Sequence, residues 1–235
     1  MGVRPRIKRL VLKVSGEVFG SDGIDAGRGG NFADELVSAA GRGVQTAVVP
    51  GGGNILRGGT ASGELGDRVS LDHMGMLATI INALALRNLL EIRGTGSVVT
   101  SPFGLEPVAE RYSPRNAIAH LEAGKIVIMA GGTGNPFFTT DTAAALRAAE
   151  IGADALLKAT KVDGVYDRDP MGGEEAKRYT SLTFTDVLKE QLGIIDAAAA
   201  ALCRDNGIPL IVFNILEPGN LHKVIDGEET GTIVN

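Results

Sequence analysis

The sequence predicts one α/β domain of three layers, with helices on both faces of a mainly parallel sheet. Short apolar, β-branched runs alternate along the chain with longer segments of helical periodicity. The short runs are apolar throughout, which is typical of strands that are buried on both faces of a parallel sheet. No linker-like or repetitive stretch divides the 235 residues. We therefore expect a single domain over residues 1–235.

Local signals place the individual elements. The runs 9–14 and 44–49 are predicted strands, because each is apolar and is followed by a turn signal containing glycine. Apolar residues recur at helical spacing over 32–40, with Asn31 as the expected N-cap and Gly43 at the end. Similar signals predict strands at 97–100, 125–130, 155–157 and 209–213, and helices at 70–93, 113–123 (with Ser113 as N-cap), 140–152, 195–204 and 219–225.

Composition excludes several classes of protein. The single cysteine, Cys203, rules out an internal disulfide framework and a zinc site made of several cysteines. A net charge of -5 disfavours binding to nucleic acid or to anionic membranes through bulk charge. Residues 1–10 lack the apolar stretch of a secretory signal, and polar residues interrupt the most apolar segment, 74–92. We expect a cytoplasmic protein without nucleic-acid or membrane partners.

Glycine is concentrated where the predicted strands end. Sixteen of the 33 glycines lie within 16–30, 51–66 and 131–134, directly after three of these strands. Ligands of parallel α/β sheets bind beyond the carboxyl ends of the strands. Glycine loops that precede helices offer backbone N–H groups to phosphate. All three loops are therefore predicted to bind phosphate.

The common phosphate-binding motifs do not account for these loops. The only Gly-Lys pair, Gly124-Lys125, is followed by isoleucine, so the Walker A pattern is missing. Neither Gly51 nor Gly132 begins a complete G-x-G-x-x-G pattern. The three histidines are too scattered along the chain to suggest a zinc site.

Several longer motifs carry a resemblance instead. The segments 13–17 (KVSGE), 51–54 (GGGN) and 57–58 (RG) resemble the amino acid kinase superfamily. The segments 72–76 (DHMGM), 133–141 (TGNPFFTTD) and 157–166 (LKATKVDGVY) resemble its UMP kinase (uridylate kinase) branch, and the likeness runs over residues 8–235. The resemblance implies ATP-dependent phosphorylation of UMP to UDP in pyrimidine nucleotide biosynthesis. It also implies Mg²⁺ held mainly by the ATP phosphates, a homohexamer built as a trimer of dimers, UTP inhibition and GTP activation.

The resemblance assigns residues to the donor and the transfer step. The ATP site is expected mainly in the C-terminal half. Lys13 ends the first strand, where its ammonium group could reach a transferring phosphoryl group. The residues implied to bind ATP are Lys13, Val14, Ser15, Gly16, Gly53, Arg57, Thr160, Tyr166 and Asp169, and those implied to take part in catalysis are Lys13, Arg57, Asp141 and Asp196. Other superfamily members tend to carry a lysine near Asp196, so a second cationic group is expected from Lys158 or Lys161.

The acceptor site is expected in the N-terminal half together with the 133–140 loop. Asp72 would accept hydrogen bonds from the ribose hydroxyls, and Thr139 or Thr140 would cap the following helix. The residues implied to bind UMP are Gly52, Asp72, Thr133, Gly134, Asn135, Pro136, Phe137, Phe138, Thr139 and Thr140, and no residue is assigned as a protein ligand of a metal.

Alternative readings stay open at several positions. Asp72 could be only the cap of the long helix, or Ser70 could hold that place. At least one of Phe137 and Phe138 is expected to anchor the core. The helix 70–93 is apolar around much of its circumference, which fits a buried core helix or, as we prefer, a subunit interface. The rival functions are an acyl-phosphate kinase of the same superfamily and a non-catalytic, nucleotide-gated oxyanion-binding relative.

Overall fold

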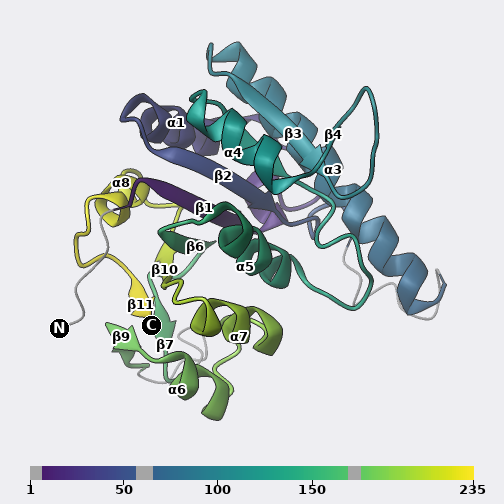
Figure 1. Ribbon diagram of the computed structural model, residues 1–235. Helices are drawn as coiled ribbons and strands as arrows, with labels where there is room; N and C mark the ends of the chain where they lie inside the picture. Colours follow the sequence, from purple (N-terminus) through teal and green to yellow (C-terminus); the bar gives the residue numbers. More distant parts are fainter. Residues whose placement is uncertain (1–6, 57–65, 169–175) are drawn as a thin grey trace.

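A nine-stranded sheet forms the centre of the computed structural model, which describes residues 7–56, 66–168 and 176–235 (Figure 1). The strand order is β4-β3-β5-β2-β1-β6-β10-β11-β9, and neighbours are parallel except β10 and β11. A separate antiparallel hairpin pairs β7 with β8. The strands are β1 Arg9–Val14, β2 Gln45–Pro50, β3 Ser97–Ser101, β4 Glu110–Arg111, β5 Ile126–Met129, β6 Ala155–Thr160, β7 Val165–Tyr166, β8 Arg178–Tyr179, β9 Ser181–Leu182, β10 Leu210–Asn214 and β11 Thr232–Val234.

Helices cover both faces of this sheet, which confirms the three-layer prediction (Figure 1). Apolar residues of α1, α3 and α8 pack on one face, and those of α4, α5, α6 and α7 pack on the other. The strands supply both layers, because successive side chains point to opposite faces. In β1, Leu10 and Leu12 join the first core and Val11 joins the second. The helices are α1 Ala26–Gly41, α3 Arg68–Ile92, α4 Pro114–Glu122, α5 Thr140–Ile151, α6 Phe184–Lys189, α7 Ala197–Asp205 and α8 Asn220–Ile225, with a 3-10 turn at Gly16–Phe19.

Helix starts follow the capping residues. The N-caps Ser113 and Thr139 are confirmed, since their hydroxyls accept backbone N–H groups of the first turns. The expected cap Asn31 is wrong: α1 begins earlier, where the Asp25 carboxylate accepts N–H groups of the first turn. Ser70 is also not a cap, because Asp67 holds that position on α3. Asp72 lies in the second turn and is therefore not needed as a cap.

The first glycine cluster is only partly a loop. Gly27, Gly29 and Gly30 lie inside α1, so the prediction that they cradle phosphate is wrong. A Cβ on Gly29 would lie 2.9 Å from Leu89 Cδ1, and one on Gly30 would lie 3.1 Å from an Arg93 guanidinium nitrogen. These glycines let α1 approach α3 closely, which is a packing role rather than a binding role.

The long helix α3 presents two different faces. One face is buried in the core and includes Ile80, Ala83 and Leu86. On the other face, Met74, Leu77 and Ile81 are each more than 40% exposed, so the reading of a fully buried core helix is wrong. By length and composition alone α3 could cross a membrane. Its packing against the sheet instead makes it a partly buried helix of the core.

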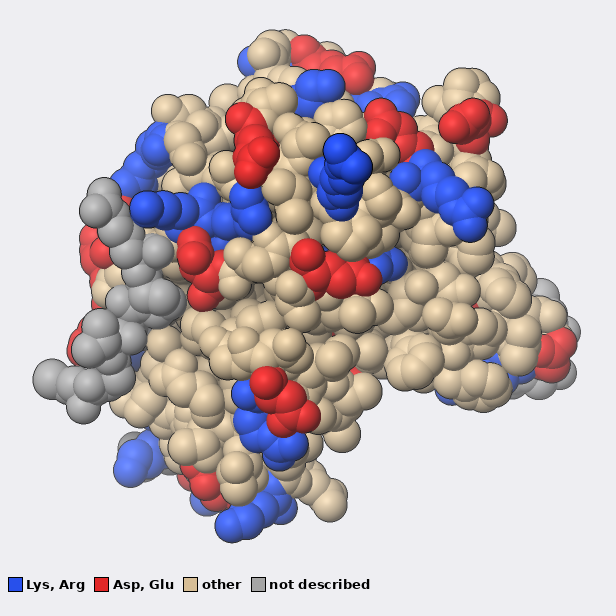
Figure 2. Space-filling model, in the orientation of Figure 1, with Lys and Arg blue, Asp and Glu red and all other residues tan. Residues whose placement is uncertain are grey.

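Charged side chains are mixed on the molecular surface. On the face shown in Figure 2, Lys and Arg side chains are interspersed with Asp and Glu side chains. The chain as a whole has 23 basic and 28 acidic residues. The charge at each cleft therefore depends on the residues that line it rather than on one sign of charge over the whole surface.

Candidate active site

Two lysines lie side by side at the centre of the sheet. Lys13 on β1 and Lys158 on β6 are register partners on adjacent parallel strands, close to their carboxyl ends. Both side chains are largely buried, at 15% and 16% exposure. The carboxylate of Asp141, in the first turn of α5, meets both of them. Lys13 Nζ lies 2.8 Å from Asp141 Oδ1, and Lys158 Nζ lies 2.6 Å from Oδ2.

The electrostatics of this Lys13–Asp141–Lys158 cluster are dominated by burial and mutual charge. Burial alone would raise the pKa of Asp141, but the two ammonium groups outweigh it and hold that pKa below its usual value. Burial lowers the pKa of Lys158, with a contribution from the charge of Lys13, although Asp141 opposes the shift. Lys158 also donates to the Ile194 carbonyl. The cluster holds two positive charges and one negative charge beside the strand ends.

Asp196 has a different environment. Its Oδ2 accepts hydrogen bonds from the hydroxyls of Thr139 and Thr142, the latter at 2.8 Å. Its Oδ1 caps α7 by accepting the Ala199 N–H at 2.9 Å. The carboxylate therefore joins the N-terminus of α7 to the end of the 133–140 loop. Through Thr139, it holds the residue that caps α5.

The loops after β1 and β2 touch each other. A Cβ on Gly16 would lie 2.3 Å from Asn54 Oδ1 and 2.9 Å from the Gly53 nitrogen, so only glycine fits there. Gly51 N donates to the Val14 carbonyl at 2.8 Å, while the Val14 side chain is buried in the core. Around Gly53, by contrast, an added Cβ would meet no atom of the described residues within 4 Å. The open space at Gly53 leaves room for a ligand.

Two polar residues of α3, neither of them expected from the sequence, fix the glycine loops. Asn82 is fully buried, donates to the Gly51 carbonyl at 2.7 Å and exchanges amide hydrogen bonds with Asn54. Thr79 accepts the Gly131 N–H at 2.7 Å. The signal was present, since these polar residues stand three apart inside an apolar helix. Such a pair on a buried face needs partners.

A small cavity of about 180 Å³ lies between these loops and α3. The Asp72 carboxylate lines it and accepts the Phe137 N–H at 2.7 Å. Phe137 and Phe138 are 67% and 50% exposed, so the expectation that one of them anchors the core is wrong. Further lining comes from Gly52, Gly53, Gly132, Thr133, Phe138, Thr139 and Thr140, and Thr133 also bonds within the loop to Asn135.

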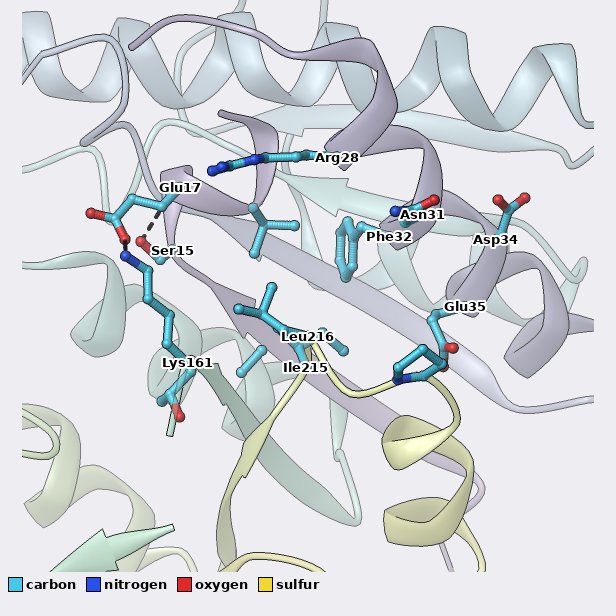
Figure 3. Close-up of a pocket in the computed structure, with 14 residues that line it drawn as sticks. Ser15, Glu17, Arg28, Asn31, Phe32, Asp34, Glu35, Lys161, Ile215 and Leu216 are labelled. Carbon is cyan, nitrogen blue, oxygen red and sulfur yellow. Dashed lines mark hydrogen bonds and ion pairs between the residues drawn. The ribbon is translucent and has the colours of Figure 1, made fainter. Parts of the chain in front are cut away.

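A larger cavity of about 730 Å³ opens between α1 and the loop that follows β10 (Figure 3). Ser15 and Thr160, both expected at the ATP site, lie in its wall, and Lys161 pairs with Glu17 at its edge. Lys161 is 66% exposed, so of the two lysines left open by the sequence only Lys158 enters the Asp141 cluster. The Thr160 hydroxyl is occupied locally, since it donates to the Val162 carbonyl at 2.6 Å.

The remaining expected residues are only partly described. Tyr166 lies on the β7–β8 hairpin and its hydroxyl donates to Asp163, a contact that raises the pKa of Tyr166. Arg57 and Asp169 fall outside the described residues. Within 7–56, 66–168 and 176–235, no group of three or more His, Cys, Asp or Glu side chains is placed to hold a metal ion.

The geometry suits transfer of a phosphoryl group between two anions. Such transfer needs positioning and neutralisation of charge rather than a covalent intermediate. Lys13 and Lys158 provide fixed positive charge, the glycine loops provide backbone N–H groups, and sequence neighbours of the cluster line each cavity: Ala159 the larger one and Thr140 the smaller one. Fold and site together define an α/β phosphotransferase.

Comparison with known proteins gives the same class. The amino acid kinase family matches residues 8–214. A uridylate kinase of Zymomonas mobilis is 50% identical over 234 residues, covering 98% of this chain and 97% of that protein. A uridylate kinase of Brucella anthropi is 51% identical over 238 residues, covering 100% and 99%. The crystal structure of a Bacillus anthracis UMP kinase matches with a TM-score of 0.95 at 38% identity, covering 98% and 97%. The chain belongs to the amino acid kinase family and, within it, to the uridylate kinases.

Proposed function

We propose that this protein phosphorylates UMP to UDP with ATP as the donor, as a step in pyrimidine nucleotide synthesis. The observation that carries the proposal is the buried Lys13–Asp141–Lys158 cluster beside the Asp72-lined cavity, in a chain about half identical to uridylate kinases over its full length. The cluster supplies the charge for transfer, and we assign the acceptor to this cavity.

The two lysines stabilise negative charge on the transferring phosphoryl group, and Asp141 positions them. A general base is unnecessary, because the attacking oxygen of a nucleoside monophosphate is already ionised at neutral pH. Asp196 acts on the acceptor loop through its hydrogen bonds to Thr139 and Thr142. Arg57, from its place after the second glycine loop, adds a positive charge between the two substrates.

The nucleotides divide between the two halves of the chain. ATP phosphates bind backbone groups of Ser15, Gly16 and Gly53, and the nucleoside lies near Thr160, Tyr166 and Asp169. UMP binds between Gly52, Asp72 and the 133–140 loop, with its ribose hydroxyls on the Asp72 carboxylate. The carboxylate of Asp141 is already occupied by two ammonium groups, so Mg²⁺ is held mainly by ATP phosphates and water. Bound there, Mg²⁺ neutralises phosphate charge.

Assembly and location are part of the proposal. The exposed apolar face of α3, formed by Met74, Leu77 and Ile81, is covered by a second copy in a homohexamer built as a trimer of dimers. We place the protein in the cytoplasm without membrane or nucleic-acid partners. Inhibition by UTP and activation by GTP rest on family resemblance alone.

Coupled measurement of ADP release tests the function directly. The purified protein is assayed with Mg-ATP and, in separate reactions, UMP, CMP, AMP and acetylglutamate. We expect fast release with UMP only. Release with acetylglutamate but not UMP would instead support the acyl-phosphate kinase. Nucleotide binding without release on any acceptor would support the non-catalytic relative.

A variant test separates the transfer step from binding. Lys13→Ala should lower kcat far more than it raises the KM for UMP, because the charge acts on the transition state. Lys8→Ala, at an exposed lysine directly before the same strand, serves as the control. A change confined to KM would mean that Lys13 only binds substrate.

A further inference from the structure

An arginine outside the cavity contacts the carboxylate inside it. Arg68 begins α3, and its Nε lies 2.8 Å and 2.9 Å from the two oxygens of Asp72. Asp72 lines the acceptor cavity, whereas Arg68 does not appear among the lining residues. The arginine side chain is 59% exposed and that of Asp72 is 19% exposed. An exposed i,i+4 pair of this kind usually contributes little to stability, so its position needs another explanation.

The same arginine also contacts the loop that Asp72 holds. The Arg68 guanidinium carbon lies 5.5 Å from the centre of the Phe137 ring, in a cation–π contact. Phe137 has a φ of 72°, in the left-handed region that an aromatic residue adopts only under constraint. Its N–H donates to Asp72 Oδ2 at 2.7 Å. Asp72 therefore holds the backbone of this strained residue while Arg68 covers its ring.

We propose that Arg68 is a positioning residue of the acceptor site, which fixes the Asp72 carboxylate and the Phe137 turn in the geometry that receives the ribose. With both oxygens oriented by Arg68 and one of them committed to Phe137, the carboxylate presents its remaining lone pairs in a fixed direction. Ribose hydroxyls that bind there meet a preformed acceptor. The inference rests on the proposed function, because it takes UMP as the acceptor.

Three variants test the proposal by steady-state kinetics at saturating ATP. In Arg68→Ala we expect the KM for UMP to rise about tenfold with kcat nearly unchanged. This is the effect of losing one charge-assisted hydrogen bond that stabilises the bound substrate and the transition state equally. Arg68→Lys keeps a charge within reach of Asp72 and should recover part of this loss. Arg87→Ala is the matched control, since Arg87 forms an i,i+4 ion pair with Glu91 on the same helix.

A second readout distinguishes positioning from general damage. The ratio of kcat/KM for UMP to that for 2′-deoxy-UMP should fall severalfold in Arg68→Ala, because the carboxylate that reads the 2′-hydroxyl has lost its orientation. A merely structural effect would weaken both acceptors equally and leave the ratio unchanged, which would overturn the proposal. So would behaviour identical to Arg87→Ala. Failure of the unmodified enzyme to use UMP would instead refute the proposed function.

Discussion

Lys13 and Lys158 are register partners on adjacent strands, so their ammonium groups reach the two oxygens of one carboxylate, that of Asp141. This arrangement concentrates positive charge without leaving it unpaired in a buried position. Burial of two neighbouring cations would otherwise be costly.

Replacing Asp141 with asparagine should destabilise the fold at neutral pH. Two largely buried ammonium groups would lose their counter-charge, so we expect the free energy of unfolding to fall by about 3 kcal/mol. The pKa of Asp141 is lowered by the lysines against the effect of burial, so its contribution is present above the usual value of 3.8 and is lost only as the pH falls through the lowered pKa.

Chemical denaturation at several pH values measures this effect. The difference between the native protein and Asp141→Asn should shrink below pH 3.8. Asp205→Asn, at an exposed carboxylate paired with Arg204, provides the control and should change little. An Asp141→Asn variant as stable as the native protein at pH 7 would contradict the prediction.

Lys158 should set an alkaline limit on activity. Burial lowers the pKa of Lys158 below its ordinary 10.5, so the ammonium loses its proton at a pH where an exposed lysine would keep it. We expect kcat to fall on the alkaline side, below pH 10.5, as that charge disappears. In the same window the unfolded chain binds more protons than the folded one, so stability from this group rises with pH.

The pH–rate profile with Lys158→Arg tests the assignment. Arginine stays charged, so the alkaline limb should move to higher pH even if kcat is lower throughout. Lys161→Arg is the matched control, because Lys161 is exposed at the rim of the larger cavity. An unchanged limb in Lys158→Arg would show that another group titrates.

Two neighbouring glycines should respond in opposite ways to alanine. At Gly16 the new Cβ would clash with Asn54, so the variant should lose about 1–3 kcal/mol of stability. At Gly53 the Cβ meets no described atom within 4 Å, so stability should stay within about 0.5 kcal/mol while the KM for ATP rises. Thermal unfolding and steady-state kinetics on both variants are the measurements. Normal ATP binding by Gly53→Ala would place the phosphates elsewhere.

Asn82 should matter for stability because it is fully buried and hydrogen-bonded to Gly51 and Asn54 of the glycine loop after β2. Asn82→Leu would remove the donor to the Gly51 carbonyl and to the Asn54 side-chain oxygen, at a cost of about 2 kcal/mol. Asn88→Leu, an exposed position on the same helix, is the control for the substitution itself. Equal denaturation midpoints for the two variants would contradict the prediction that the hydrogen bonds of Asn82 stabilise the glycine loops.

The exposed face of α3 should determine assembly. Leu77 is 50% exposed, and Leu77→Glu would place a charge in the middle of the proposed interface. We expect sedimentation velocity to show smaller species than for the native protein. Lys189→Glu on α6 changes the charge elsewhere and should leave the sedimentation coefficient unaltered. A native protein that sediments as a monomer would refute the interface.

The sequence was sufficient for the main architecture because the strong signals are local. Strands such as Ile126–Met129 are continuous apolar runs, and caps such as Thr139 satisfy the first N–H groups of their helix. Short elements escaped prediction, including α6 and strands such as β4 and β11. A strand of two or three residues is too short to show a periodic pattern, and its pairing depends on residues that are distant in the sequence.

The sequence predicted which residues belong to the candidate site, but not which of them contact one another. Lys13 and Asp141 were expected from motifs, yet the choice of Lys158 over Lys161 depends on register with β1. The glycines of α1 looked like a loop, since glycine density does not distinguish a ligand contact from close helix packing. The proposed role of Arg68 depends on a contact with Phe137, which is distant from Arg68 in the sequence.

The central position of β1 has a consequence for the order of folding during synthesis. The strand leaves the ribosome before the other strands of the sheet and can pair with β2, but its other edge awaits β6, where Leu10 meets Ala155. Until then an apolar strand keeps one row of backbone groups unpaired, which is the condition that favours aggregation of nascent chains. A truncated chain that ends before β6 should therefore depend on chaperones, whereas a chain that includes β6 pairs both edges of β1.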